Sequence, residues 1–213
     1  MKSDIFDPGC RRCPRLAAYL RQMRVSYPHY HNAPVPSFGP LDARLLIVGL
    51  APGMHGANAT GRPFTGDYAG ILLYSALHRC GLATAAESVS AGDGLELIDC
   101  RITNAVKCLP PQNKPTTAEV NTCNRYLTAE IDACGARAIL ALGAIAHRAI
   151  LRALGLRLSA WPFGHGARHE IGDGRILFDS YHCSRYNTQT RRLTEVMFVD
   201  VLTAARDASR VAA

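Results

Sequence analysis

The sequence lacks several features that would by themselves decide a class of protein. No run of about 18 apolar residues occurs in the chain of 213 residues, so no membrane-spanning helix is expected. The first eight residues contain no apolar signal core, which predicts a cytoplasmic protein rather than an exported one. Internal repeats, low-complexity tracts and interdomain linkers are also missing, and the length suits one domain over residues 1–213.

Acidic residues are fewer than basic ones. The chain has 17 Asp and Glu against 24 Lys and Arg, and its formal net charge is +7. A basic surface gains free energy by displacing counterions from nucleic acid, so an anionic partner is permitted. Two groups of arginines predict basic patches, namely Arg11, Arg12 and Arg15, and then Arg185, Arg191 and Arg192.

The eight cysteines are not expected to form disulfides, because the chain has no export signal. Cys10 and Cys13 form a C-x-x-C pair, Cys108 follows an expected strand, and Cys123 lies further on in an expected helix. Four thiolates in this order can hold a Zn²⁺ ion or an iron–sulfur cluster, and the spacing alone leaves both open. The remaining four are interpreted as buried small apolar residues or incidental thiols: Cys80, Cys100, Cys134 and Cys183.

Strand and helix patterns alternate along most of the chain. The expected strands are 44–50, 99–107, 137–142 and 175–180, and the expected helices are 15–24, 68–80, 117–133, 144–154 and 191–208. This alternation predicts an α/β protein, a single three-layer α/β/α domain with a central four-stranded parallel sheet. Thr116 and Glu119 have the spacing of a capping box, Thr190 is the expected N-cap of the last helix, and residues 83–94 are the expected place for local disorder.

A long loop over residues 49–67 is the most informative stretch. Its glycines and prolines fix unusual backbone angles, and it matches neither G-x-x-x-x-G-K-[ST] nor G-x-G-x-x-G, which disfavours a nucleoside triphosphate. In open α/β sheets ligands bind beyond the carboxyl ends of the strands. This loop, Asn104 and His182 all follow such ends, so they are expected at one rim. An ordinary surface loop is the alternative interpretation.

Three motifs in this chain resemble those of the iron–sulfur uracil-DNA glycosylases. The first is Gly49-Leu50-Ala51-Pro52-Gly53 with Gly61-Arg62-Pro63-Phe64-Thr65-Gly66-Asp67, whose insertion at residues 55–58 resembles the family 5, type B branch. The second ends in Asn104, and the third runs from His182 to Thr194. The third motif departs from the family pattern, because Cys183 stands where Pro is frequent and Arg191 where Gly is frequent. The first has Leu50 and Ala51 where other branches carry an acidic or amide residue.

The resemblance implies release of uracil, and of other deaminated or modified bases, from DNA by a monomeric enzyme of base-excision repair. Asp67 would orient water or stabilise the sugar cation, Asn104 would read the pyrimidine edge, and His182 would donate a hydrogen bond toward O2. Asp67 as a helix N-cap and Asn104 as a local backbone partner are the structural alternatives. Phe64 is expected to stack on a flipped base, with Gly53 beside it.

The resemblance also implies a [4Fe–4S] cluster on Cys10, Cys13, Cys108 and Cys123, which we interpret as structural. The residues expected to contact DNA are His55, Asn58, Arg62, Ser184, Arg185, Tyr186 and Asn187. Two other hypotheses are a non-catalytic DNA-binding module with the same fold and cluster, and an iron–sulfur protein of electron transfer or redox sensing.

Overall fold

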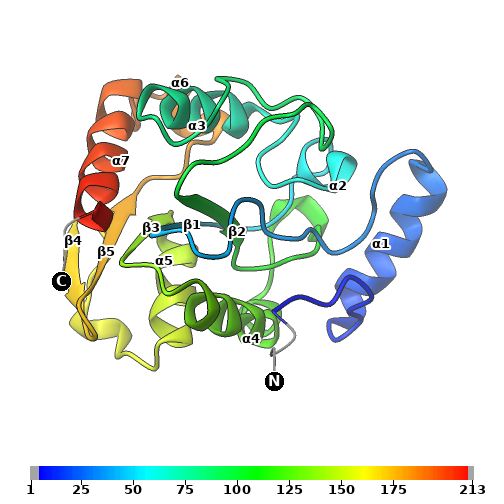
Figure 1. The fold of residues 1–213 in the computed structure, drawn as a ribbon. Coiled ribbons are helices and arrows are strands. Elements are labelled where there is room, and N and C mark those ends of the chain that lie inside the picture. The colour runs from blue at the N-terminus through cyan, green and yellow to red at the C-terminus, as the bar shows by residue number, and fades with distance from the viewer. Residues whose placement is uncertain (1–4, 211–213) are drawn as a thin grey trace.

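The computed structural model describes residues 5–210, so both ends of the expected 1–213 domain lie outside the described residues. A five-stranded sheet lies at its centre (Figure 1). The strands are β1 (Leu45–Gly49), β2 (Cys100–Asn104), β3 (Ala138–Leu142), β4 (Arg168–Ile171) and β5 (Arg175–Ser180). Their order is β2-β1-β3-β5-β4. All neighbouring pairs are parallel except β4 and β5, which are antiparallel.

The four parallel strands are the four that the sequence predicts, but a four-stranded sheet is wrong by one edge strand. Three of the four residues of β4, Arg168, His169 and Glu170, are polar and at least partly exposed, so this strand has no apolar alternation to reveal it. An edge strand with one solvated face tolerates such a sequence. A tight turn at Gly172–Gly174 returns the chain into β5.

Helices cover both faces of the sheet, which confirms the three-layer architecture (Figure 1). The longer helices are α1 (Pro14–Ser26), α3 (Tyr68–Arg79), α4 (Thr117–Cys134), α5 (Ala144–Ala153) and α7 (Glu195–Arg210). The short ones are α2 (Ala57–Thr60), α6 (Arg185–Gln189) and the 3-10 turns η1 (Pro111–Asn113) and η2 (Leu158–Ala160). Within residues 5–210, no helix has the length and apolar character needed to cross a bilayer.

Two apolar clusters fill the space between the layers. Alternate residues of a strand point to opposite faces, so Leu45 and Ile47 of β1 pack in the cluster with α3 and α7. Leu46 and Val48 pack in the other cluster, with α1, α4 and α5. Every residue of β1 is buried on both faces, which is why the strand reads as a continuous apolar run.

The helix starts follow from local side-chain contacts. The Thr116 hydroxyl accepts from the Glu119 backbone N–H, and the Glu119 carboxylate accepts from the Thr116 N–H at 2.8 Å, which confirms the capping box. The Asp67 carboxylate accepts from the Gly70 N–H at 2.9 Å and starts α3 in the same way.

The expected helix over 191–208 is wrong at its start. The chain forms α6 first, and Thr190 ends this helix instead of capping the next. The Thr194 hydroxyl accepts from the Met197 N–H at 3.2 Å and so takes the capping role for α7. Between the two helices Arg191 has a φ of 57°, in the left-handed region that glycine adopts without steric cost. The glycine frequent at this position in the resembled motif therefore has a conformational reason.

We predict that Arg191→Gly raises the free energy of unfolding by about 1 kcal/mol, because it removes the strain of a positive φ. Chemical denaturation would measure the change. Arg192→Gly is the matched control, since Arg192 has no positive φ and its guanidinium lies 4.5 Å from the centre of the Tyr181 ring. Its stability should not rise. A less stable Arg191→Gly protein would contradict the prediction.

Candidate active site

A pocket of about 820 Å³ opens at the carboxyl ends of the parallel strands. Its walls come from the loop between β1 and α3, from the end of β2 and from the segment that follows β5. Eight of the residues expected in the site line it: Gly53, His55, Phe64, Asp67, Asn104, His182, Ser184 and Arg185. The expectation that three separate segments meet at one rim is therefore confirmed.

The floor of the pocket depends on the missing side chain of Gly49. The register of β1 and β2 pairs Gly49 with Asn104. A Cβ at Gly49 would clash with the Asn104 amide oxygen and would lie 2.6 Å from Cζ of Phe64. Glycine at the end of β1 is thus required for the strand, the amide and the aromatic ring to fit together.

Asn104 presents an unused hydrogen-bonding atom at this floor. Its side chain is 4% exposed, and Oδ1 has no hydrogen-bond partner among residues 5–210. A buried amide oxygen without a partner costs free energy, and a donor on a bound molecule would remove that cost. The position of Asn104 in the pocket lining makes it available to such a molecule.

Phe64 is held in a strained but enclosed position. Its φ is 55°, and its side chain is buried. Gly70 packs against the Phe64 carbonyl so closely that any Cβ there would overlap it. The ring centre lies 6.0 Å from that of His182, with 30° between the ring planes. Phe64 and His182 therefore present two neighbouring rings to the pocket.

Asp67 is the carboxylate of the pocket lining. One of its oxygens accepts from Gly70, and the other lies beside Gly53 and Gly56, where a Cβ would be 3.3 Å and 2.5 Å away. Burial raises the pKa of Asp67, while hydrogen bonds from the backbone N–H groups of Gly70 and Ala69 oppose that rise. Because Gly53 and Gly56 have no Cβ, neither residue covers the second oxygen with a side chain.

His182 is neutral at physiological pH, because burial lowers its pKa to about 4. Its ring makes no hydrogen bond to any other residue within 5–210, so a ring N–H is free to donate to a bound molecule. The backbone is firmly placed instead. The Asn187 side chain donates to the His182 carbonyl at 2.8 Å, and the Ser184 hydroxyl caps α6.

The rim of the pocket carries aromatic and basic side chains. Tyr186 on α6 is 70% exposed, and the Arg185 guanidinium lies 4.9 Å from the centre of the Tyr68 ring. His55 hydrogen-bonds through Nδ1 to the Tyr30 hydroxyl at 3.0 Å. No role is expected for Tyr30 from the sequence alone, although the tyrosines and histidines at residues 27–31 are a signal that could have drawn attention to it.

Tyr68 and Asn113 also line the pocket and were missed. Tyr68 is the first residue of α3, so the sequence pattern placed it in a helix and gave no sign that its side chain also lines the pocket. Asn113 follows Gln112, and both have a positive φ, of 56° and 55°. No sequence signal distinguishes such a turn from an ordinary proline-rich loop.

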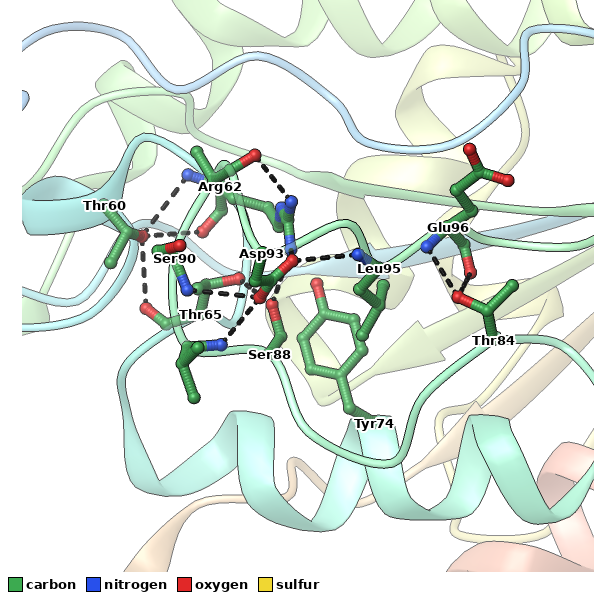
Figure 2. A network of polar contacts seen from close by, with 12 residues as sticks. Thr60, Arg62, Thr65, Tyr74, Thr84, Ser88, Ser90, Asp93, Leu95 and Glu96 are labelled. Atoms are coloured by element: carbon green, nitrogen blue, oxygen red, sulfur yellow. Dashed lines mark hydrogen bonds and ion pairs between the residues drawn. The ribbon is translucent and has the colours of Figure 1, made fainter.

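Arg62 occupies a structural position rather than a surface one (Figure 2). Its side chain is 6% exposed and pairs with Asp93 at 2.6 Å, and it also donates to Ser88 and to the Ala91 carbonyl. These contacts argue against the expected contact with DNA. They also correct the expectation of disorder at residues 83–94, because they fasten this loop to the pocket loop.

Asn58 is likewise fully buried. Its Nδ2 donates to Oδ1 of Asn32 at 2.8 Å, and Asn32 in turn donates to carbonyls near the end of α1. The residue joins the pocket loop to the amino-terminal segment, so burial argues against the predicted DNA contact here as well.

Comparison of the sequence with known proteins identifies the family of this chain. The family model described as "Uracil DNA glycosylase superfamily" matches residues 36–206. The chain belongs to the uracil-DNA glycosylase superfamily. It is 48% identical to the type-5 uracil-DNA glycosylase of Thermus thermophilus, over 93% of each chain. It is 44% identical to that of Pyrobaculum aerophilum, over 94% of this chain and 89% of the relative.

The four cysteines that are expected to bind a metal or a cluster lie around a second hollow, beside α1 and α4. Cys10, Cys13, Cys108 and Cys123 all line it. Burial, followed by the effect of Cys123, raises the pKa of Cys13 to about 11, and the same two causes raise that of Cys108 to about 12. Buried thiols that lie this close to other thiols form a site that a bound cation would stabilise.

The spacing of these sulfurs bears on the identity of the cation. The sulfurs around one tetrahedral Zn²⁺ ion lie about 3.8 Å apart, given a Zn–S distance of about 2.3 Å. Among residues 5–210, no three cysteine sulfurs lie within 4.8 Å of one another. The four cysteines therefore do not have the sulfur spacing of a site closed around a single Zn²⁺ ion.

We predict that the His182 ring remains neutral from pH 8 down to pH 5, because burial lowers its pKa to about 4. NMR of protein with ¹³C-labelled histidine would show no shift of its ring signal over this range. His182→Gln assigns the signal by removing it. The urea-unfolded protein is the control, since imidazoles in unfolded chains titrate near pH 6.5. A midpoint between pH 6 and 7 in the folded protein would contradict the prediction.

Proposed function

We propose that this chain is a monofunctional uracil-DNA glycosylase of base-excision repair, which hydrolyses the N-glycosidic bond of uracil in DNA. The observation that carries this proposal is the convergence of Asp67, Asn104 and His182 on one pocket beside the ring of Phe64. The type-5 uracil-DNA glycosylases that it resembles along most of its length support it. Other deaminated or modified bases are included in the proposed substrates.

Recognition would begin when the base leaves the duplex and enters the pocket. The Phe64 ring would stack on it, and an aromatic face accepts any base without reading its edge. Asn104 would read the pyrimidine edge, because an amide offers both a donor and an acceptor. The unpartnered Oδ1 of Asn104 suits the imino N–H of uracil and would repel the unprotonated N3 of cytosine.

Bond cleavage builds negative charge on the departing base and positive charge on the sugar. A neutral His182 ring would donate a hydrogen bond to O2 of the base, where the negative charge develops. The Asp67 carboxylate would stabilise the sugar cation or orient the attacking water. The Gly70 N–H at the start of α3 holds one Asp67 oxygen in place, and the other oxygen would do this work.

Contact with DNA would be made by the rim of the pocket. The exposed Tyr186 and the neighbouring Arg185 would enter the gap that the flipped nucleotide leaves. His55 and Ser184 would contact phosphates, as would the face of Asn187 that does not hold the His182 carbonyl. Arg62 and Asn58 are omitted from this surface because they are buried.

A [4Fe–4S] cluster would be held by Cys10, Cys13, Cys108 and Cys123. When bound, it supplies a covalent tie between the amino-terminal segment, the loop after β2 and α4. The cluster takes no part in the hydrolysis proposed here, because the cysteines line a hollow separate from the pocket.

We predict that the purified protein releases uracil from a duplex with one uracil, seen as strand cleavage after alkali. Asp67→Asn should reduce the rate at least 100-fold, an order of magnitude typical for a group that acts only in the transition state. Asn is itself a good N-cap, so this variant keeps the start of α3 and its melting temperature. Asp67→Ala loses both charge and cap, so the difference between its melting temperature and that of Asp67→Asn gives the cost of the cap.

Asn104→Ala is the companion variant, and it should lose discrimination between uracil and cytosine more than affinity for DNA. If Asp67→Asn cleaves as fast as the wild type, the enzyme stands but Asp67 has no chemical role. If the wild type cleaves no duplex that contains uracil, hypoxanthine or hydroxymethyluracil yet still binds DNA, the chain is the non-catalytic module instead.

We predict about four iron and four sulfide ions per chain, with the broad visible absorption of a [4Fe–4S] cluster. Cys108→Ser should lose the iron and melt at a lower temperature, because the tie to the loop after β2 is cut. Cys134→Ser is the control, since Cys134 is buried outside the cysteine hollow and should keep the full iron content. A colourless protein that contains zinc would refute the cluster.

A further inference from the structure

A second group of metal-ligating side chains lies away from the pocket and from the cysteines. His147 on α5, His169 on β4 and Asp179 on β5 offer ligand atoms that all lie within 4.8 Å of one another. Within residues 5–210, no other set of three His, Cys, Asp or Glu residues is this close. None of the three lines the proposed active site.

The hydrogen bonds of His147 define what can occupy the centre of this group. Its Nε2 lies 2.8 Å from the carbonyl oxygen of Trp161, and since a carbonyl only accepts, Nε2 must carry a proton. Its Nδ1 lies 2.7 Å from an Asp179 carboxylate oxygen. In a neutral ring Nδ1 is a lone pair, and it would face another acceptor. A hydrogen bond of this length requires a proton between the two atoms, and a bound metal ion would take the place of that proton.

His169 completes a set of three metal-ligating groups. Its Nε2 approaches the other Asp179 oxygen at 3.3 Å, and the Gly164 N–H donates to this oxygen at 3.4 Å. A carbonyl that accepts from the second nitrogen of a ligand histidine is the usual arrangement around metals, because it fixes the ring and its tautomer. The aromatic rings of Trp161 and Phe163 enclose the histidines.

A metal ion could reach this group from the side of His169. His147 and Asp179 are 2% and 0% exposed, whereas the His169 side chain is 13% exposed. Two imidazoles and one carboxylate with an open side form a common three-ligand Zn²⁺ site, in which water takes the fourth position. We propose that His147, His169 and Asp179 bind one Zn²⁺ ion, which fastens the β4–β5 edge of the sheet to α5.

The test uses the full-length, cluster-loaded protein, cleared of loosely bound metal with a chelator and then exposed to a small excess of Zn²⁺. After gel filtration, zinc and iron are measured together for wild type, His169→Ala and His78→Ala. His169 is chosen because it is partly exposed on an edge strand, and His78 is an exposed histidine of α3 that serves as the matched control.

Wild type and His78→Ala should each retain one zinc ion per chain more than His169→Ala, with equal iron in all three. Zn²⁺ should also raise the melting temperature of the first two and not of the third, since a ligand that binds only the folded state stabilises it. Equal zinc in all three proteins would overturn the proposal and leave a proton between His147 and Asp179. Unequal iron would show zinc at the cysteines and would overturn it as well.

Co²⁺ provides a second measurement on the folded wild type. In a difference spectrum against the same protein without Co²⁺, which removes the absorption of the cluster, the tetrahedral complex with nitrogen and oxygen ligands should show visible bands without the charge-transfer band of a thiolate ligand. Asp179→Asn should lose these bands. A thiolate band in the wild type would place the metal at cysteine and overturn the assignment.

Discussion

The close approach of β1 to β2 at their carboxyl ends is the constraint on which the site depends. Parallel pairing sets Gly49 beside Asn104, and the missing Cβ of Gly49 leaves room for the Asn104 amide and the Phe64 ring together. From that point the loop must turn sharply to reach α3. The positive φ of Phe64 and the contact between Gly70 and the Phe64 carbonyl are local consequences of this crowding. The strain is tolerated because buried polar contacts on either side of the loop hold it.

The end of β2 connects the proposed base-reading residue to the cysteine hollow through a few residues of chain. Asn104 faces the pocket, and Cys108 lines the hollow. Between them Lys107 is buried and pairs with Glu130 of α4 at 3.0 Å, while its backbone N–H donates to Cys123 Sγ at 3.3 Å. Burial would raise the pKa of Glu130, but Lys107, Ser37, Arg101 and Thr103 lower it to about 2, so the carboxylate is ionised and firmly paired. A group bound by the cysteines would therefore stiffen the segment that carries Asn104.

The sequence predicts the elements that have a local residue pattern, and it predicts that the loops after the parallel strands meet at one edge of the sheet. It does not predict features that depend on contacts between residues far apart in the chain. Buried parallel strands read as apolar runs, and Thr116 and Asp67 carry their capping chemistry in their own neighbourhood. β4 was missed because its residues are polar, and the start of α7 because Thr190 and Thr194 are equally good caps by type. Arg62 shows the main limit. An arginine in a site loop predicts a phosphate contact, and its partner Asp93 lies too far along the chain to be recognised from sequence. The three proposed Zn²⁺ ligands could not be grouped from the sequence for the same reason, because they lie on three different elements, α5, β4 and β5.

The departure of this chain at Leu50 and Ala51 gives Asp67 its importance. Without a polar residue there, the carboxylate nearest to the proposed reacting bond is one that also starts a helix. These two roles assist each other. Burial raises the pKa of Asp67, which on its own would favour the neutral acid, and the N–H groups of Gly70 and Ala69 oppose it. Positive charge at a helix N-terminus stabilises the anion further. Burial also strengthens the field of a carboxylate on a neighbouring sugar cation, so the N–H groups that favour the anion serve the proposed chemistry as well as the helix.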